Sequence, residues 1–203
     1  MNILAIGSHP DDIEYGCGGT LLKFKEEGHK INMLIMTKGD VGGTPKTRSK
    51  EQILSARILD AKIYWGGLKD TRIVVDRKTI GIIEKTIALV KPYIVFTHYH
   101  NDTHQDHRHI SQATMVATRH MRNVLFYEVP TTMEFLPTVF VKIDKLLDRK
   151  LKLLHSHESQ VYAMKIPGLN ILENVKSCAI FRGFQDRVRF AEGFMPLRLS
   201  LKL

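Results

Sequence analysis

Two short segments carry side chains that bind metals or move protons. The first, SHPDDIE at Ser8 to Glu14, places His9, Asp11 and Asp12 directly after an apolar run. Because Asp11 and Asp12 are adjacent, their carboxylates point in different directions in an extended or turning backbone. One can then ligate a metal while the other faces the attacking water. Taken alone, the segment fits equally well a helix cap beside a polar surface histidine.

The second segment, His98 to His109, packs five histidines and two aspartates into twelve residues. So many histidines are rarely used to fill a core, because each buried imidazole needs partners for its ring nitrogens. The alternative to a functional site is a solvated polar loop. A helical turn places His104 and His107 on one face, which suits one as a metal ligand and the other as an acid or oxyanion stabiliser. Asp106 is placed to orient an imidazole by a hydrogen bond.

Together the two segments predict a metal-dependent hydrolase. Two histidines and one carboxylate leave a coordination position open, as a catalytic zinc requires, and the same donors suit iron(II). A second carboxylate beside the metal favours hydrolysis, since it can take the proton of the attacking water.

The surrounding residues predict the strands and helices that position these side chains. Apolar runs predict buried strands, and periodic segments bounded by glycine or proline predict helices. The strands are expected at Ile3–Ile6, Ile31–Met36, Tyr93–Thr97 and Thr138–Ile143, and the helices at Leu21–Glu27, Lys50–Ala61, Arg77–Val90 and Asp144–Leu154. This alternation predicts one domain over residues 1–203, with an α/β, Rossmann-like, doubly wound and mostly parallel sheet covered by helices on both faces. Ligands of such sheets bind at the carboxyl ends of the strands, which both polar segments follow.

At these residues the sequence resembles the LmbE-like or PIG-L family of zinc N-deacetylases, which act on N-acetylglucosaminyl compounds. The similarity extends from the first predicted strand almost to the end of the chain. It is carried by His9-Pro10-Asp11-Asp12, Gly16-x-Gly18-Gly19-Thr20, Arg48-x-x-Glu51, His104-x-Asp106-His107, Ser159-Gln160 and Ala191-Glu192-Gly193-Phe194.

The resemblance implies a role for each matching position. It implies that His9, Asp12 and His107 bind zinc, with iron(II) as the alternative metal, and that Asp11 is the general base. A cyclic homo-oligomer is also consistent with the family.

By the same resemblance, His104 stabilises the oxyanion or protonates the leaving amine, and Asp106 holds His104. Arg48 matches a position that approaches the substrate, where a guanidinium suits a sugar hydroxyl or a phosphate oxygen. The sequence departs from some family members at Asp102-Thr103, in place of a tyrosine-containing loop, and at Phe190, where tyrosine is frequent.

Composition narrows the class of protein. The 30 Lys and Arg residues give a formal charge of +9 but are scattered, so nucleic-acid binding is not predicted, whereas an acidic or phosphorylated small substrate is favoured. Two cysteines, the lack of a signal-peptide pattern at the first residues and the lack of a bilayer-spanning apolar run predict a cytoplasmic protein without a membrane span.

The predicted reaction is therefore zinc-dependent hydrolysis of the acetamide of an N-acetylated amino sugar or sugar conjugate. Two alternatives remain open at the level of sequence. A metal-dependent phosphoesterase would suit the basic charge and the glycine-rich stretch, and predicts two metals in many such enzymes. A catalytically silent sugar- or nucleotide-binding module would use the same fold without turnover.

Overall fold

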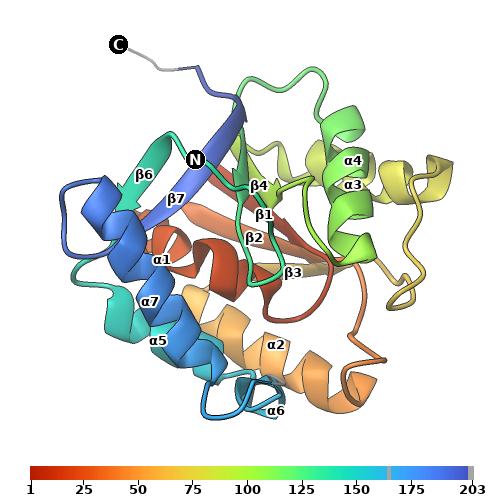
Figure 1. Ribbon diagram of the computed structural model, residues 1–203. Coiled ribbons are helices and arrows are strands. Elements are labelled where there is room, and N and C mark those ends of the chain that lie inside the picture. The colour runs from red at the N-terminus through yellow and green to blue at the C-terminus, as the bar shows by residue number, and fades with distance from the viewer. Residues whose placement is uncertain (164–165, 201–203) are drawn as a thin grey trace.

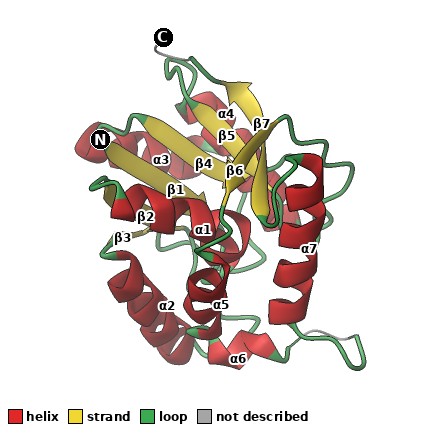
Figure 2. Cartoon of the chain, turned by 90° about the vertical axis from the view of Figure 1, so that its left-hand side faces the viewer, coloured by secondary structure: helices red, strands yellow, loops and turns green. Residues whose placement is uncertain are grey.

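A mixed sheet organises the protein, whose computed structural model describes residues 1–163 and 166–200. The strand order is β3-β2-β1-β4-β5-β7-β6, with helices on both faces (Figure 1, Figure 2). The strands are β1 (Asn2–Gly7), β2 (Lys30–Ile35), β3 (Lys62–Trp65), β4 (Ile94–His98), β5 (Val124–Tyr127), β6 (Val139–Lys142) and β7 (Ala191–Arg198). β1 to β5 pair in parallel, while β7 runs antiparallel between β5 and β6. The predicted α/β, mostly parallel sheet is confirmed.

Alternate residues of the strands supply two separate cores. Successive side chains of a strand point to opposite faces, so Ile3 and Ala5 of β1 pack in one apolar cluster, and Leu4 and Ile6 in the other. One face is covered by α1 (Asp12–Glu26), α2 (Pro45–Leu59), α5 (Leu147–His155) and α7 (Ile171–Gln185). The other is covered by α3 (Arg77–Val90) and α4 (Gln105–Ala117). The short α6 (Glu158–Val161) contacts α2, α5 and α7.

The reversal of strand order beside β1 fixes where a ligand can bind. β1 pairs with β2 on one side and with β4 on the other. The connection after β1 therefore leads to one half of the sheet, and the connection after β4 leads to the other half. In doubly wound sheets the crevice at the carboxyl ends of such strands is the ligand site. Both polar segments follow these two strands, and the fold therefore brings them to the same edge.

The first helix differs from the prediction. A short helix at Leu21–Glu27 behind a glycine-rich loop was expected, but α1 begins at Asp12 and passes through the glycines, with one non-helical residue, Cys17 (φ −142°, ψ 15°). Gly16 is required for close packing, because a Cβ there would lie 2.1 Å from Cδ2 of Tyr127. The glycines thus serve packing and a kink rather than a phosphate-binding loop.

Two buried charged side chains from the second half of the chain, Lys150 and Glu192, form hydrogen bonds with backbone groups of the kinked helix α1. Backbone N–H groups of Gly19 and Thr20 donate to the Glu192 carboxylate at 2.8 and 2.7 Å, and Lys150 Nζ donates to the Tyr15 carbonyl at 2.6 Å. Lys150 and Glu192 also pair with each other at 2.5 Å. The groups released by the kink are thereby satisfied, as buried backbone polar groups must be.

The remaining predicted elements agree with the structure apart from their ends. α2 begins at Pro45 rather than Lys50, because Thr44 caps it by accepting a hydrogen bond from the Thr47 N–H at 3.2 Å. β3, β5, β7, α6 and α7 were not identified from the sequence pattern, and of α4 only the helical turn at His104 to His107 was predicted. In the described part of the chain, no helix is both long and apolar enough to cross a bilayer.

Candidate metal and active site

The turn after β1 separates the two adjacent carboxylates. Asp11 precedes α1 with φ 99°, a left-handed conformation that non-glycine residues rarely adopt and that is typical of functional sites. Asp12, the first helical residue, turns its carboxylate back to accept a hydrogen bond from the His9 N–H at 2.7 Å. The Asp12 carboxylate faces the histidines, while the Asp11 carboxylate faces Arg48. The predicted divergence of the two side chains is observed.

β4 and α4 supply the other imidazoles. His98 is the last residue of β4, and its Nε2 lies 3.1 Å from Asp12 Oδ2. His104 caps α4, because its Nδ1 accepts a hydrogen bond from the Asp106 N–H at 3.2 Å. His107 lies in the first turn of α4, with its ring stacked on His98 at 4.1 Å and on His104 at 4.5 Å between centroids.

His9, Asp12 and His107 converge on one point. Each offers a ligand atom within 4.8 Å of the others, and all three are buried. His107 Nε2 lies 3.3 Å from His9 Nδ1 and 3.4 Å from Asp12 Oδ1, and His9 Nδ1 lies 3.4 Å from Asp12 Oδ2. Two imidazoles and one carboxylate are a donor set that suits zinc or iron(II). The residues present therefore fit a divalent ion.

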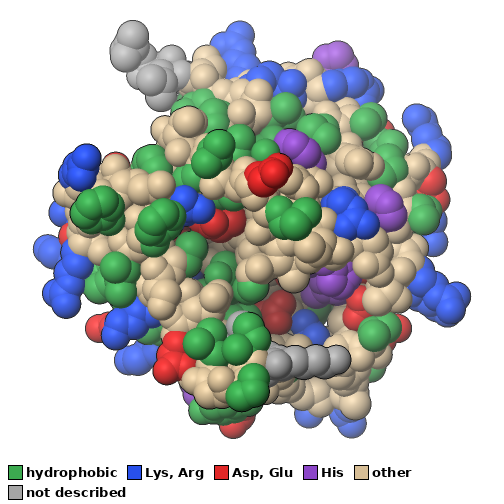
Figure 3. All heavy atoms as spheres, in the orientation of Figure 1, with side chains coloured by type: hydrophobic (Ala, Val, Ile, Leu, Met, Phe, Trp, Pro, Cys, Tyr) green, Lys and Arg blue, Asp and Glu red, His purple; other side chains and the backbone are tan. Residues whose placement is uncertain are grey.

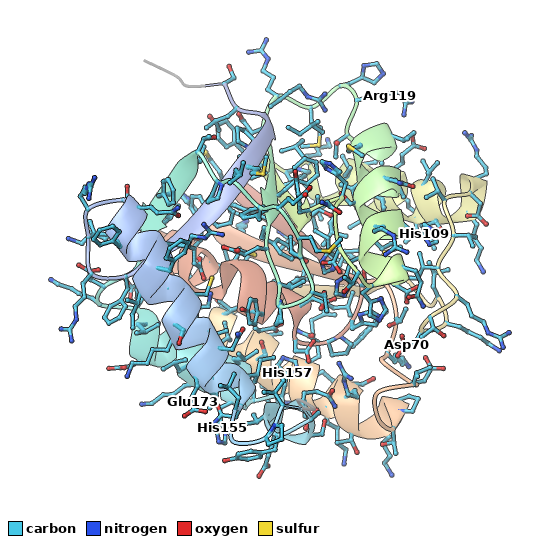
Figure 4. All side chains as sticks on the ribbon, viewed as in Figure 1. Asp70, His109, Arg119, His155, His157 and Glu173 are labelled. Carbon is cyan, nitrogen blue, oxygen red and sulfur yellow. The ribbon has the colours of Figure 1, made fainter. Side chains whose placement is uncertain are left out.

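Carboxylates hold the outward nitrogens of the two converging histidines. His9 Nε2 lies 3.0 Å from Asp70 Oδ1 and 3.2 Å from Asp106 Oδ2, and His107 Nδ1 lies 3.3 Å from Asp102 Oδ2. Such contacts fix the tautomer and orientation of metal-binding histidines. Asp70 lies in the loop after β3, between the starts of α2 and α4 (Figure 4).

The carboxylates around these histidines are held in the ionised form. Burial alone would raise the pKa of Asp70 and of Asp102, but the His9 contact lowers the first and the His107 contact the second, each to about 2. Burial would likewise raise the pKa of Asp12, yet the His107 and His98 imidazoles outweigh it and hold that pKa well below its usual range.

A second set, His9, His104 and Asp106, also brings one ligand atom each within 4.8 Å. It shares His9 with the first set, and its other members already have partners. The Asp106 carboxylate accepts hydrogen bonds from the Thr71 N–H at 2.8 Å and the Ile73 N–H at 3.3 Å. The first set is the better cation site, because His9 Nδ1, His107 Nε2 and Asp12 Oδ1 face one another, and the one backbone hydrogen bond among its ligand groups, from the His9 N–H, goes to the other Asp12 oxygen, Oδ2.

Asp11 is partly buried and lies against a guanidinium. Arg48 Nη2 donates to the Pro10 carbonyl at 2.6 Å and lies 3.4 Å from Asp11 Oδ2. Burial raises the pKa of Asp11 to about 6, an effect that Arg48 opposes and neighbouring Asp12 reinforces. A carboxylate with a pKa near the working pH is suited to take and return a proton.

Asp106 and His104 are arranged differently from the expectation. The Asp106 carboxylate lies against His9, and it is the backbone N–H of Asp106 that contacts the His104 imidazole. Burial and the neighbouring His107 lower the pKa of His104. A neutral His104 whose Nδ1 accepts a hydrogen bond carries its proton on Nε2.

The site forms the wall of an open hollow of about 290 Å³. Figure 3 shows it below the centre of the face, where purple histidine and red acidic side chains lie in a depression. It is lined by His9, Asp11, Asp12, Val41, Gly42, Arg48, Asp70, Thr71, His104, His107 and Gln160. All six residues predicted from the two polar segments lie in or directly behind this wall, together with Arg48.

Comparison with known proteins places this arrangement in a family. The family profile described as "PIG-L: GlcNAc-PI de-N-acetylase" matches residues 4–118, more than half of the chain. The chain belongs to the PIG-L family. Its relatives include the uncharacterized deacetylase YaiS of Escherichia coli K12, 35% identical over 77% of this chain and 90% of YaiS. Diacetylchitobiose deacetylase of Thermococcus kodakarensis is 27% identical over 96% of this chain and 83% of its own length.

The fold comparison agrees with the sequence comparison. The crystal structure of the conserved protein TT1542 from Thermus thermophilus superimposes with a TM-score of 0.89 and 27% identity, covering 99% of this chain and 96% of that one. Family membership and relatives named as deacetylases make this chain a deacetylase, a hydrolase of amide bonds.

The site residues that sequence reasoning missed are Asp70 and His98, and Asp102 was treated only as a departure from the family. Asp70 gave no signal, because the strand before its loop was not recognised. His98 and Asp102 lay inside the histidine-rich segment, but only the topology shows that they face Asp12 and His107.

Proposed function

We propose that this deacetylase hydrolyses the acetamide of an N-acetylated amino sugar or sugar conjugate, releasing acetate and a free amine, with zinc as its metal. The observation that carries the proposal is the convergence of His9 Nδ1, Asp12 and His107 Nε2 on one point beside Asp11, in the wall of an open hollow.

His9, Asp12 and His107 are the proposed metal ligands. When bound there, a divalent cation supplies Lewis-acid polarisation of the acetamide carbonyl and lowers the pKa of a water molecule. Asp70 and Asp106 behind His9, and Asp102 behind His107, keep the two imidazoles turned toward the cation. Zinc is proposed over iron(II) because hydrolysis needs no redox change at the metal.

Asp11 and His104 are the proposed catalytic side chains. Asp11 takes a proton from water as the oxygen attacks the acetamide carbon, and returns it to the nitrogen as the carbon–nitrogen bond breaks. Arg48 holds Asp11 in place, and the contact with substrate that the resemblance implies for Arg48 stays a prediction. His104 Nε2–H donates to the oxyanion, since its Nδ1 is occupied by the Asp106 N–H.

An N-acetyl sugar is supported as the substrate by the relatives and by the size of the site. One relative is named for diacetylchitobiose, and the family profile for an N-acetylglucosaminyl lipid. The hollow of about 290 Å³ is at the small end of ligand pockets, which suits one sugar ring with the remainder of the conjugate outside.

The test is an acetate-release screen over N-acetyl sugars with zinc-loaded protein, with metal content measured on the same sample. One zinc per chain and release of acetate from at least one sugar are expected. Asp11→Asn should keep the metal and lose about 100- to 1,000-fold in kcat, the usual effect of removing a group that acts in the transition state. Absence of acetate from every N-acetyl sugar, or a wild-type rate for Asp11→Asn, contradicts the proposal.

A further inference from the structure

We propose that the hollow selects N-acetyl sugars whose remainder is uncharged, and that Gln160 is a specificity residue that accepts a hydrogen bond from a sugar hydroxyl. This inference rests on the proposed function and defines its substrate class. It runs against the expectation drawn from the +9 charge, which favoured acidic or phosphorylated substrates.

The guanidinium in the wall of the hollow is covered. Arg48 is 4% exposed and is directed at the Pro10 carbonyl and the Asp11 carboxylate. The loop between β2 and α2 packs against the Arg48 guanidinium, so closely that a Cβ on Gly39 or Gly42 would lie 2.8 Å from it. A phosphate on the substrate cannot reach this group without displacing the loop.

The charge around the hollow is negative. Among the lining residues that the structure describes, Asp11, Asp12 and Asp70 carry carboxylates and Arg48 is the one Lys or Arg. Asp102 and Asp106 lie directly behind the histidines, where the Arg108 guanidinium donates to the Asp102 carbonyl at 2.6 Å, so the described part of this region holds five carboxylates against two guanidinium groups. With neutral imidazoles, a divalent cation still leaves these described groups one charge negative. Most Lys and Arg side chains on this face lie at its edge (Figure 3).

Gln160 presents an acceptor to the hollow because its donor group is already used. Its Nε2 donates to the Gly42 carbonyl at 3.0 Å and to Ser159 Oγ at 3.1 Å. Ser159 is fixed in turn by Glu51, which accepts hydrogen bonds from the Ser159 N–H and Oγ, each at 2.7 Å. The two Nε2 contacts set the orientation of the amide, and the Gln160 carbonyl oxygen accepts no hydrogen bond from the described residues, which leaves it for a ligand.

The chemistry offered to a substrate follows from these contacts. Carboxylates and an amide oxygen accept hydrogen bonds from hydroxyls, whereas a phosphate or carboxylate on the ligand meets like charge and finds few free donors. A binding site commonly rejects a ligand by placing like charge opposite the ligand's charged group and offering that group no partner. A neutral polyol bearing an acetamide fits the hollow, and its anionic counterpart does not.

The first experiment compares N-acetylglucosamine with its 1-phosphate at increasing sodium chloride concentration. The neutral sugar should have a kcat/KM at least about tenfold higher at low salt, since two added charges meet a negative site. Salt should raise kcat/KM for the phosphate by screening this repulsion and leave the neutral sugar unchanged. A preference for the phosphate that falls with salt overturns the inference.

A charge substitution tests Gln160 directly. Gln160→Lys replaces the acceptor with a cation and should raise the phosphate-to-neutral ratio of kcat/KM roughly tenfold. Gln185→Lys, at the exposed end of α7, adds the same charge to the protein outside the hollow and should leave the ratio unchanged. Equal ratios for Gln160→Lys, Gln185→Lys and wild type remove Gln160 from substrate selection.

Binding separates this inference from the proposed reaction. Calorimetric titration of zinc-loaded protein with both sugars should show tighter binding of the neutral one. If neither sugar releases acetate but the neutral one binds tighter, the reaction is refuted and the selectivity stands. If the phosphate is deacetylated faster or binds tighter, the reaction stands and the selectivity is refuted. If neither sugar is bound or hydrolysed, both proposals are wrong.

Discussion

Asp102→Asn is the substitution that most directly tests the proposed metal site. The 1%-exposed Asp102 carboxylate accepts hydrogen bonds from the His104 N–H at 2.8 Å and from Thr132 Oγ1 at 3.0 Å, and lies 3.3 Å from His107 Nδ1. An asparagine has the same shape but replaces one acceptor oxygen with an NH2 donor. The orientation that keeps the amide oxygen on the His104 N–H turns the NH2 group toward His107 Nδ1, which must then accept a hydrogen bond. The proton of His107 is then favoured on Nε2, the nitrogen directed at the metal.

The size of the effect follows from the contact that is lost. Replacing the partner of a metal-bound histidine typically costs 10- to 100-fold in metal affinity, or about 1.4 to 2.8 kcal/mol. A charge-assisted hydrogen bond contributes about 1.5 to 3 kcal/mol, which agrees with this range. We therefore expect the dissociation constant for zinc to rise about 10- to 100-fold in Asp102→Asn.

The assay is competition for zinc between the protein and a chromophoric chelator at fixed pH, with thermal unfolding of the metal-free and zinc-loaded forms. The zinc-dependent increase in Tm should shrink with the loss of affinity. Asp60→Asn makes the same chemical change at an exposed residue with left-handed backbone, which asparagine tolerates, and should leave zinc affinity unchanged. If Asp102→Asn binds zinc as tightly as wild type, His107 is not a ligand through Nε2.

Three further predictions concern stability and the metal. Glu192→Ala leaves the Lys150 ammonium buried and unpaired, and should lower the free energy of unfolding by about 3 to 5 kcal/mol. This is measured by urea unfolding, and a loss below about 1 kcal/mol would show that the Lys150–Glu192 pair does not stabilise the kinked helix. Gly16→Ala forces a methyl group into the Tyr127 ring and should lower the free energy of unfolding by about 1 to 3 kcal/mol. Gly81→Ala in α3 has open space around its Cβ and should raise that free energy by about 0.5 to 1 kcal/mol. Equal effects of the two variants in urea unfolding would contradict the close packing of Gly16 on Tyr127. Chelation should abolish acetate release and lower Tm, with both restored by zinc; full activity in metal-free protein would refute a metal role.

The strands and helices of the first half were largely predictable because their signals are local. Arg77–Val90 was predicted with the observed bounds, since its apolar spacing is regular and Pro92 follows it. The first helix was not, because glycines at 16, 18 and 19 usually indicate a loop. The groups that stabilise the helix there, Glu192 and Lys150, lie more than 130 residues later and carry no local signal.

The site was predictable in its membership more than in its contacts. The two segments that contain His9, Asp12 and His107 could be singled out by residue type and spacing, because few other structures need imidazoles and carboxylates at such density. The choice of these three as metal ligands came from the family resemblance. The partner of each group depends on tertiary geometry: Asp106 lies against His9 rather than His104, and Arg48 is buried against Asp11. Asp70 could not be found at all, since its loop follows a short strand with a weak sequence pattern.

The hydrogen bonds from α1 to Glu192 have a consequence for how the protein matures. The helix that begins with Asp12 keeps its bent shape only when β7, near the far end of the chain, has joined the sheet. Contacts between such distant segments form late and slow folding. We therefore expect the turn that carries the proposed metal ligands His9 and Asp12 to stay incompletely fixed during synthesis until β7 has left the ribosome. A fragment that ends at residue 118, where the family profile ends, would lack this support and should fail to retain zinc.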